Sequence, residues 1–439
     1  MRRSRWWANS VFALIAYIAS AGIAPAADVS VPASTGDEPA QVLTREQALE
    51  QALAANPAIR ALTREVEAAR ARRLQADGFA PPSFVYDFEE ARDSNPSRFG
   101  NQKYGVEQTI EWPGRRRLLK QFAALGVDAA QAALARTRLR LTAQVRKAFD
   151  QVLANEAALT LITDAAARMQ ESVDVSRGRF RAGTDKYLDV LRTQVEAQRL
   201  QNDRRLAEIA VREARRNFNV LLGESRLRFT VTGELELAPM NIEREALMAT
   251  ATETGPSFQL LARRAEQAQT RYEAVRKGRY PNIGVGVQRQ RLYGPAAETE
   301  YAWAGTLSLS LPLPGTDRQR GLEGEALAQA QAAVDRVRAA RLSFEARMQQ
   351  RYDEAVAAAA RIESYRASIL PDVEDQLKSA QQEYRVRRID ALNLLDAYRT
   401  YLATQRDYLE ALAGYRAALA DLETWGEDLW EVPDVGAVE

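Results

Sequence analysis

Four carboxylates stand at alternate positions of two short segments, a spacing that could do chemistry. Asp87 and Glu89 alternate with aromatic residues, and Glu107 and Glu111 lie two positions on either side of Thr109. Residues two apart in a strand share a face, so each pair would lie on one surface. Close carboxylates can act as general acid and base or attract cations. A cation-favouring surface and a plain hydrated surface remain open, whereas a glycosidase-like pair has no further support in the sequence.

The composition removes most other reactive chemistry. The 439 residues include no histidine and no cysteine, which excludes Ser–His–Asp catalysis, thiolate nucleophiles, iron–sulfur clusters and the usual zinc sites. The few methionines are too scattered for a copper relay, and there is no Walker A loop. We therefore predict a protein that is not an enzyme, with no cofactor and no resident metal. Its 60 basic and 59 acidic residues give no support for nucleic-acid binding.

The first residues have the pattern of a secretory signal peptide. Arg2, Arg3 and Arg5 precede an apolar stretch at residues 11–23, and Ala24-Pro25-Ala26 supplies small residues before a cleavage site. We assign residues 1–27 to the signal peptide and 28–43 to a flexible linker with Pro and Gly. No later segment approaches the roughly 18 apolar residues of a membrane-spanning helix. The exported chain is expected to be soluble in the periplasm or an outer-membrane protein of the β type.

The remaining sequence reads as two copies of one unit, offset by about 200 residues. Trp112-Pro113-Gly114 in the first copy corresponds to Leu313-Pro314-Gly315 in the second, and Asn56-Pro57 corresponds to Gly255-Pro256. Matching turn signals at one offset are hard to obtain by chance. The predicted divisions are 44–222 for the first copy, 223–241 for an inter-repeat equatorial segment, 242–428 for the second copy and 429–439 for a C-terminal tail.

Each copy predicts an ordinary helix broken at a proline, a β-hairpin and two long helices. The expected helices cover 44–78, 115–178 and 185–222 in the first copy and 242–277, 318–387 and 390–428 in the second. The expected hairpins cover 83–112 and 282–312, and 229–232 is expected to form a short strand. Pro371 should kink or split the long helix that contains it. Alanine-rich faces favour close packing of the helices in a curved wall.

The alternating segments have the length and polarity of transmembrane β-strands of about 8–11 residues. A soluble half-buried sheet gives the same alternation, but two such hairpins between long helices in an exported chain favour the membrane. Four strands cannot close a barrel, and lipid does not tolerate open strand edges. Three chains would give twelve strands, whereas two would leave no conduit. The predicted fold class is an α+β membrane protein: a homotrimeric 12-stranded transmembrane β-barrel, four strands per chain, continued by a long α-helical barrel.

This duplicated plan resembles the TolC family of outer-membrane efflux proteins over essentially the whole mature chain. Residues 106–116, which include Trp112-Pro113-Gly114, are similar to the family's passage from strand to long helix and look most like its CzcC-like heavy-metal branch. The resemblance implies a passive outer-membrane duct of a tripartite efflux system, exporting heavy-metal cations or, alternatively, drugs or proteins. The implied partners are two further copies, a periplasmic adaptor, an inner-membrane RND transporter and outer-membrane lipid. A soluble periplasmic coiled-coil adaptor is the alternative from a different class, and adaptors lack the two lipid-length hairpins.

The resemblance also implies site residues. Ala182-Gly183-Thr184 resembles the turn at the periplasmic tip that receives the adaptor, so Gly183 and Thr184 are expected to dock it, whereas 386–388 depart from this pattern. Tyr384 and Asp396 match residues of the family's closed entrance. Arg387 and Arg388 are expected to pair there with carboxylates of neighbouring helices. The expected gate is Tyr384, Arg387, Arg388, Asn393 and Asp396, and the expected barrel lumen includes Asp87, Glu89, Glu107 and Glu111.

Overall fold

The computed structural model describes residues 41–92, 98–184, 186–224, 229–293, 299–310, 312 and 316–427. The predicted signal peptide, residues 28–40 of the predicted linker and the predicted C-terminal tail lie outside the described residues. The described residues belong to one compact unit that begins at Gln41.

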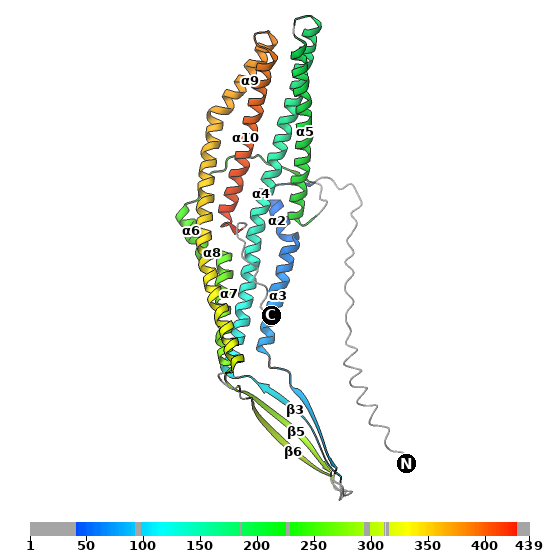
Figure 1. The fold of residues 1–439 in the computed structure, drawn as a ribbon, viewed down its shortest axis with the longest axis vertical. Coiled ribbons are helices and arrows are strands. Elements are labelled where there is room, and N and C mark those ends of the chain that lie inside the picture. The colour runs from blue at the N-terminus through cyan, green and yellow to red at the C-terminus, as the bar shows by residue number, and fades with distance from the viewer. Residues whose placement is uncertain are drawn as a thin grey trace, which may run out of the picture. The chain divides into compact units, whose positions relative to one another are not determined.

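The same succession of elements occurs twice along the chain (Figure 1). The first half contains α2 (Arg45–Ala55), α3 (Pro57–Asp77), β2 (Ser83–Arg92), β3 (Arg98–Ile110), α4 (Pro113–Arg181) and α5 (Tyr187–Leu222). The second contains α6 (Arg244–Thr254), α7 (Pro256–Lys277), β5 (Asn282–Tyr293), β6 (Thr299–Ser310), α8 (Asp317–Ser364), the π-helix η1 (Tyr365–Ile369), α9 (Leu370–Arg385) and α10 (Ala391–Glu423). The helices and strands expected from the sequence are therefore present, with ends shifted by a few residues.

Local sequence signals explain where the first two helices begin. The Thr44 hydroxyl accepts a hydrogen bond from the Gln47 N–H, and the Gln47 side chain accepts one from the Thr44 N–H, a reciprocal capping box. Asn56 ends α2 and caps α3, because its side chain accepts from the Ala58 N–H. Pro57 occupies the first turn of α3, where its missing N–H has no partner to lose.

Helix α4 is the longest element, and most other helices pack beside it. Its 69 residues rise about 1.5 Å each, which gives a length of about 100 Å. It lies beside α3 and α7 in the half nearer the sheet and beside α5 and α10 further on (Figure 1). Many of its buried side chains are alanines, such as Ala129, Ala132 and Ala143. Small side chains let these helices approach closely over a thin seam rather than around a thick core.

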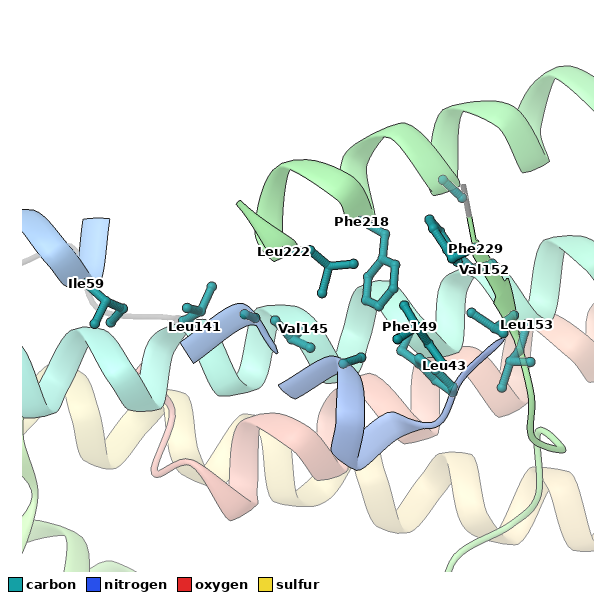
Figure 2. Close-up of a cluster of buried hydrophobic side chains, with 14 residues drawn as sticks. Leu43, Ile59, Leu141, Val145, Phe149, Val152, Leu153, Phe218, Leu222 and Phe229 are labelled. Atoms are coloured by element: carbon teal, nitrogen blue, oxygen red, sulfur yellow. The ribbon is translucent and has the colours of Figure 1, made fainter. Parts of the chain in front are cut away.

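A cluster of buried apolar side chains joins α4, α5 and two short strands (Figure 2). Phe218 packs edge-on against Phe149 and Phe229, with ring centroids 6.0 and 5.2 Å away. Leu43, fully buried in this cluster, belongs to β1 (Gln41–Leu43), which pairs in parallel with β4 (Phe229–Val231). The prediction that the flexible linker extends to residue 43 is therefore wrong, because Leu43 anchors its last residues in the core. The short strand expected at 229–232 is confirmed.

The long helix of the second half changes its hydrogen bonding just before Pro371. Within η1 the N–H of Leu370 donates to the carbonyl of Tyr365, five residues back. Pro371 then sits in the first turn of α9, where the helix bends (Figure 1). Proline has no N–H for the regular bond and crowds the preceding turn, so the wider turn accommodates it. The kink predicted at Pro371 is confirmed.

The four long strands form one antiparallel sheet in the order β2-β3-β5-β6. Its register sets Val106 opposite Phe84 and Val287. Directly opposed residues share a face, so one face is largely apolar and the other largely polar. Among the described residues, no helix is long and apolar enough to cross a membrane.

Candidate functional site: the sheet and the helical hairpin tips

The polar face of the sheet gathers three of the four predicted lumen acids. Asp87, Glu89 and Glu107 share this face, because the register pairs Asp87 with Lys103 and Ser83 with Glu107. The ammonium of Lys103 therefore lies across from Asp87 on the same surface. Acids outnumber bases in this set, so the face is negative but not uniformly so.

Glu107 also fixes the polar face across an intervening strand. Its Oε1 accepts a hydrogen bond of 3.0 Å from the Ser308 hydroxyl on β6, although β5 lies between them. The bond passes over Gly284, where an added Cβ would come within 2.2 Å of Ser308 Oγ and 2.7 Å of Glu107 Oε1. Glycine at position 284 is therefore needed for this contact.

The fourth predicted lumen acid, Glu111, lies outside the sheet. Strand β3 ends at Ile110, two residues earlier than the strand expected from the alternation. Glu111 instead lines a cavity of about 740 Å³ at the junction of the sheet with α3 and α4. There Arg116 lies 3.5 Å from the Phe79 ring centroid and donates to the carbonyls at the end of α3. The strand ends here because Pro113 starts α4.

Aromatic side chains lie on the apolar face of the sheet and at its junction with the helices. At the junction, beyond the end of β3 and before the start of β5, the rings of Trp112 and Tyr280 stack at 5.2 Å and 11°. Across the sheet Tyr86, Tyr104 and Trp303 share the apolar face, with Tyr104 in the middle of β3, and Trp303 is 73% exposed.

The two helical hairpins end in the same backbone motif. We call residues 182–184 the first tip and 386–388 the second tip. Backbone N–H groups bond back to carbonyls in the order Gly183 to Phe180 (2.9 Å), Thr184 to Arg179 (3.0 Å), Arg387 to Tyr384 (3.2 Å) and Arg388 to Glu383 (2.8 Å). This is the Schellman pattern, which needs a left-handed residue after the helix. The sequence of the second tip departs from the first, but its backbone does not.

A contact between the hairpins places the two tips side by side. The Arg179 guanidinium donates to the carbonyls of Tyr384 and Arg385 at 2.6 and 3.0 Å. It also lies 4.5 Å from the centroid of the Tyr384 ring, which is buried. A cation on the last carbonyls of α9 is favourable, because they form the negative end of the helix. Sequence reasoning missed this contact, because nothing near Arg179 in the sequence indicates a partner 205 residues away.

The other predicted gate residues do not form one cluster. Asn393 donates through its side chain to Asp390, the N-cap of α10, and so completes that cap. Asp396 is exposed on α10. Arg387 and Arg388 are exposed, and the expected pairing with carboxylates is absent within the described residues of the chain.

A second tie joins the hairpins about three helical turns from the tips. Arg399 of α10 holds Glu196 of α5 by two bonds, of 2.6 and 3.2 Å, and the Glu196 side chain is almost fully buried. Glu196 and Arg399 stabilise each other because both carboxylate oxygens are engaged by the planar guanidinium. The hairpins are thus tied at two levels.

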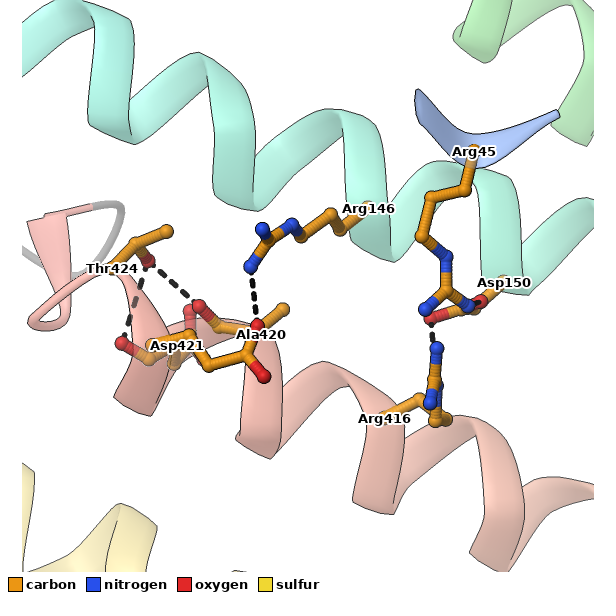
Figure 3. A network of polar contacts seen from close by, with 8 residues as sticks. Arg45, Arg146, Asp150, Arg416, Ala420, Asp421 and Thr424 are labelled. Atoms are coloured by element: carbon orange, nitrogen blue, oxygen red, sulfur yellow. Dashed lines mark hydrogen bonds and ion pairs between the residues drawn. The ribbon is translucent and has the colours of Figure 1, made fainter. Parts of the chain in front are cut away.

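A buried ionic site lies deeper among the helices (Figure 3). Asp150 of α4 bonds to Arg45 of α2 and, at 3.4 Å, to Arg416 of α10. Burial raises the pKa of the Asp150 carboxyl to about 6, although Arg45 opposes this shift. Sequence reasoning missed this site. The feature that could have revealed it is Asp150 itself, an acid next to Phe149 and Val152 on the apolar side of α4.

The end of α10 is held to α4 and α8 by further ion pairs. Lys147 of α4 and Arg351 of α8 both pair with Asp421, and Arg146 pairs with Glu423. Because α10 belongs to the second half and α4 to the first, these pairs bind the two halves together. Among the described residues, no group of three or more Asp or Glu side chains converges as a metal site would require.

Long paired helices with a four-stranded sheet at one end are the fold of solved outer-membrane channels. The structure superposes on CusC with a TM-score of 0.73 at 15% identity, covering 87% of this chain and 91% of that one. It superposes on the outer-membrane channel OprN with a TM-score of 0.75 at 19% identity, covering 87% and 89%.

The sequence profile of the outer membrane efflux protein family matches residues 48–224 and again 247–425, and the chain belongs to this family. It is 25% identical over 383 residues to the cobalt-zinc-cadmium resistance protein CzcC of Cupriavidus metallidurans. These residues cover 87% of this chain and 89% of that protein. The family comprises channel proteins of efflux systems in the outer membrane of Gram-negative bacteria, not enzymes. The predicted family, outer-membrane location and efflux role are confirmed.

Proposed function

We propose that three copies of the chain form a channel-tunnel, a twelve-stranded β-barrel in the outer membrane continued by a tube of helices. The observation that carries this proposal is the four-stranded sheet itself. In the described residues β2 and β6 each have one unpaired edge, and one face is apolar. Unpaired backbone groups are not tolerated in lipid, so the edges must pair with other copies.

The number of copies follows from what a closed sheet must enclose. A barrel of eight strands holds little more than its own side chains, whereas twelve strands leave space for a passage. A symmetric ring of three chains also lets the long α4 and α8 helices continue the wall. The polar face with Asp87, Glu89 and Glu107 would then line the lumen.

Assembly can be tested on the protein extracted in detergent. Light scattering should give the mass of three chains, and circular dichroism should show mixed α and β structure. Outer-membrane fractions should release the protein with detergent and not with salt washes. A stable, membrane-inserted monomer would contradict closure by three copies.

We further propose that the channel is passive and works with an inner-membrane RND transporter and a periplasmic adaptor. The adaptor would contact the hairpin tips, where Gly183 and Thr184 lie at the surface. Gly183 has open space around it, because an added Cβ would meet nothing within 4 Å. Gly183→Trp should therefore abolish efflux while leaving assembly intact, and retained efflux would remove the first tip as the docking site.

The proposed substrates are heavy-metal cations. The similarity to CzcC, a cobalt-zinc-cadmium resistance protein, supports this class, and so does the negative lumen face. Deleting the gene should sensitise cells to cobalt, zinc or cadmium, and the intact gene on a plasmid should restore resistance. If the deletion strain becomes sensitive to drugs but not to these metals, the substrates are drugs rather than heavy-metal cations.

A further inference from the structure

Two arginines lie on the apolar face of the sheet. The register sets Arg289 opposite Tyr104 and Trp303, and Arg291 opposite Tyr301. Both arginines therefore point to the side that carries the apolar and aromatic residues. An arginine on a lipid-facing surface needs a counter-charge or an interfacial position.

Aromatic rings hold the first of these arginines in place. The Arg289 guanidinium carbon lies 4.9 Å from the ring centroid of Tyr301 and 5.8 Å from that of Trp303. Such cation–π contacts orient a guanidinium without using its N–H donors. The Nε of Arg289 is buried and has no hydrogen-bond partner among the described residues. Arg291, two residues along the strand, is exposed.

Most acids of the sheet lie on the polar face, namely Asp87, Glu89, Glu107 and Glu300. The register of the apolar face also includes Glu90, which stands on β2 opposite Gly100, two strands away from β5. Within the described residues Arg289 and Arg291 form no ion pair, so a counter-charge beside β5 would come from a bound group.

The position of the arginines along the strand identifies where that counter-charge would be. Both lie in the part of β5 close to Tyr293, the end remote from the helices, whereas Asn282 begins the strand next to α7. With the helices in the periplasm, this end reaches the outer leaflet. Aromatic residues such as Tyr301 and Trp303 are typical of the headgroup level of a membrane.

We propose that Arg289 and Arg291 bind a phosphate-bearing lipid headgroup of the outer leaflet. Guanidinium groups bind phosphate oxygens through paired N–H donors, which suits two arginines on one strand face. Tyr301 and Trp303 orient Arg289 and contact the less polar part of the same lipid. This inference rests on the proposed function, because it requires the apolar face to lie in the bilayer.

The test uses the full-length mature protein in phosphatidylcholine nanodiscs, with lipid A carrying both phosphates as the probe. Native mass spectrometry counts the bound lipid A. The double variant Arg289→Gln/Arg291→Gln should bind it at least tenfold more weakly than the unmodified protein. The matched control Lys103→Gln removes one positive charge from the opposite face at a similar depth and should leave binding unchanged. The variant Arg289→Lys/Arg291→Lys keeps both positive charges and should retain part of the affinity for lipid A. It controls for the loss of binding that a misfolded sheet would cause.

Two results would overturn the inference. The first is that the unmodified protein binds dephosphorylated lipid A as tightly as the phosphorylated form. The second is that the affinity of the glutamine variant for lipid A is within twofold of the affinity of the unmodified protein. Flotation of the unmodified protein with phosphatidylcholine vesicles separates this failure from failure of the proposed function. Protein that floats without phosphate preference contradicts the lipid site alone, whereas protein that does not insert contradicts both.

Discussion

Arg387 occupies in the second hairpin the left-handed backbone position that Gly183 occupies in the first. Their φ angles are +65° and +70°, and each closes a Schellman turn. Glycine adopts this conformation without strain, whereas an L side chain costs about 1–2 kcal/mol there. The second tip therefore retains a strained arginine at the end of the helices where the adaptor is proposed to bind. Such strain is often found at functional sites.

The two tips should respond to exchange of these residues in opposite directions. Arg387→Gly relieves the strain and should stabilise the second tip by about 1 kcal/mol, whereas Gly183→Ala should destabilise the first by about as much. Steric contact does not enter, since a Cβ at Gly183 meets nothing within 4 Å. Hydrogen exchange of the Thr184 and Arg388 amides measures both effects as about fivefold changes in protection. Faster exchange of the Arg388 amide in Arg387→Gly would contradict the strain.

The tie between Arg179 and Tyr384 predicts the behaviour of the proposed gate. Arg179→Ala removes two hydrogen bonds and a cation–π contact, so the two tips should separate more easily. Single-channel conductance in planar bilayers should rise. Arg181→Ala, which removes an exposed arginine of the same turn, is the matched control and should leave conductance unchanged.

A double-mutant cycle isolates the contribution of the ring. Tyr384→Leu removes the aromatic face but leaves the backbone carbonyls, so the coupling to Arg179→Ala should be about 0.5–1 kcal/mol. Additive effects of the two changes would show that the carbonyl contacts alone hold the tips together.

Asp150 predicts a specific dependence of stability on pH. Its pKa in the folded chain is raised from 3.8 to about 6, so folding takes up a proton between these values. The free energy of unfolding should therefore fall as the pH rises from about 4 to about 6 and be level above that for this group. One pKa unit corresponds to about 1.4 kcal/mol, so the span is about 3 kcal/mol per chain.

The variant Asp150→Asn should remove this part of the slope in denaturant unfolding measured from pH 4 to pH 7. Asp396→Asn removes an exposed acid of α10 and should leave the slope as it is. Burial also raises the pKa of Glu427, so some slope of the same sign should remain in Asp150→Asn. An unchanged slope in Asp150→Asn would show that the raised pKa of Asp150 makes no contribution.

The sheet register predicts how the cost of a charge varies with its position. Val287 lies near the middle of the apolar face. Insertion of Val287→Arg into the membrane should cost about 2–4 kcal/mol per copy, so this variant should lower the yield of assembled protein most. Leu309 lies at the end of β6 that is next to the helices. Insertion of Leu309→Arg should therefore cost only about 0–1 kcal/mol per copy. Ser308→Arg, on the polar face, is the control. An equal loss of outer-membrane protein in Ser308→Arg and Val287→Arg would contradict the assignment of the two faces.

The elements of this fold could be predicted because their signals are local. Pro57 and Pro256 mark the helix breaks, and alternation marks the strands around Val106 and Val285. These patterns depend on each segment's own period and on residues a few positions away. The strand end at Ile110 was missed because the alternation continues to Trp112, although the chain already turns into α4.

Contacts between distant segments could not be predicted in this way. Arg179 meets Tyr384 across more than 200 residues, and Arg416 meets Asp150 across 266. An arginine on an exposed helix face and one that closes such a contact look alike in a sequence with 60 basic residues. The left-handed backbone of Arg387 could not be predicted either, because its charge indicated an ion pair, whereas the conformation of the second tip depends on its backbone hydrogen bonds.

The π-helix before Pro371 keeps a heptad pattern in phase. Ala355 and Ile362 are buried seven residues apart in α8 and pack on α10, and Leu377 and Tyr384 are buried seven apart in α9 and pack on it too. Ile362 and Leu377 are separated by two heptads and one residue, and the wide turn of η1 absorbs that residue. Loss of one residue within 365–369 would keep the stripe aligned but would place Pro371 inside a regular helix, where it removes one hydrogen bond. Gain of one would rotate Tyr384 by about 100° away from α10 and from Arg179.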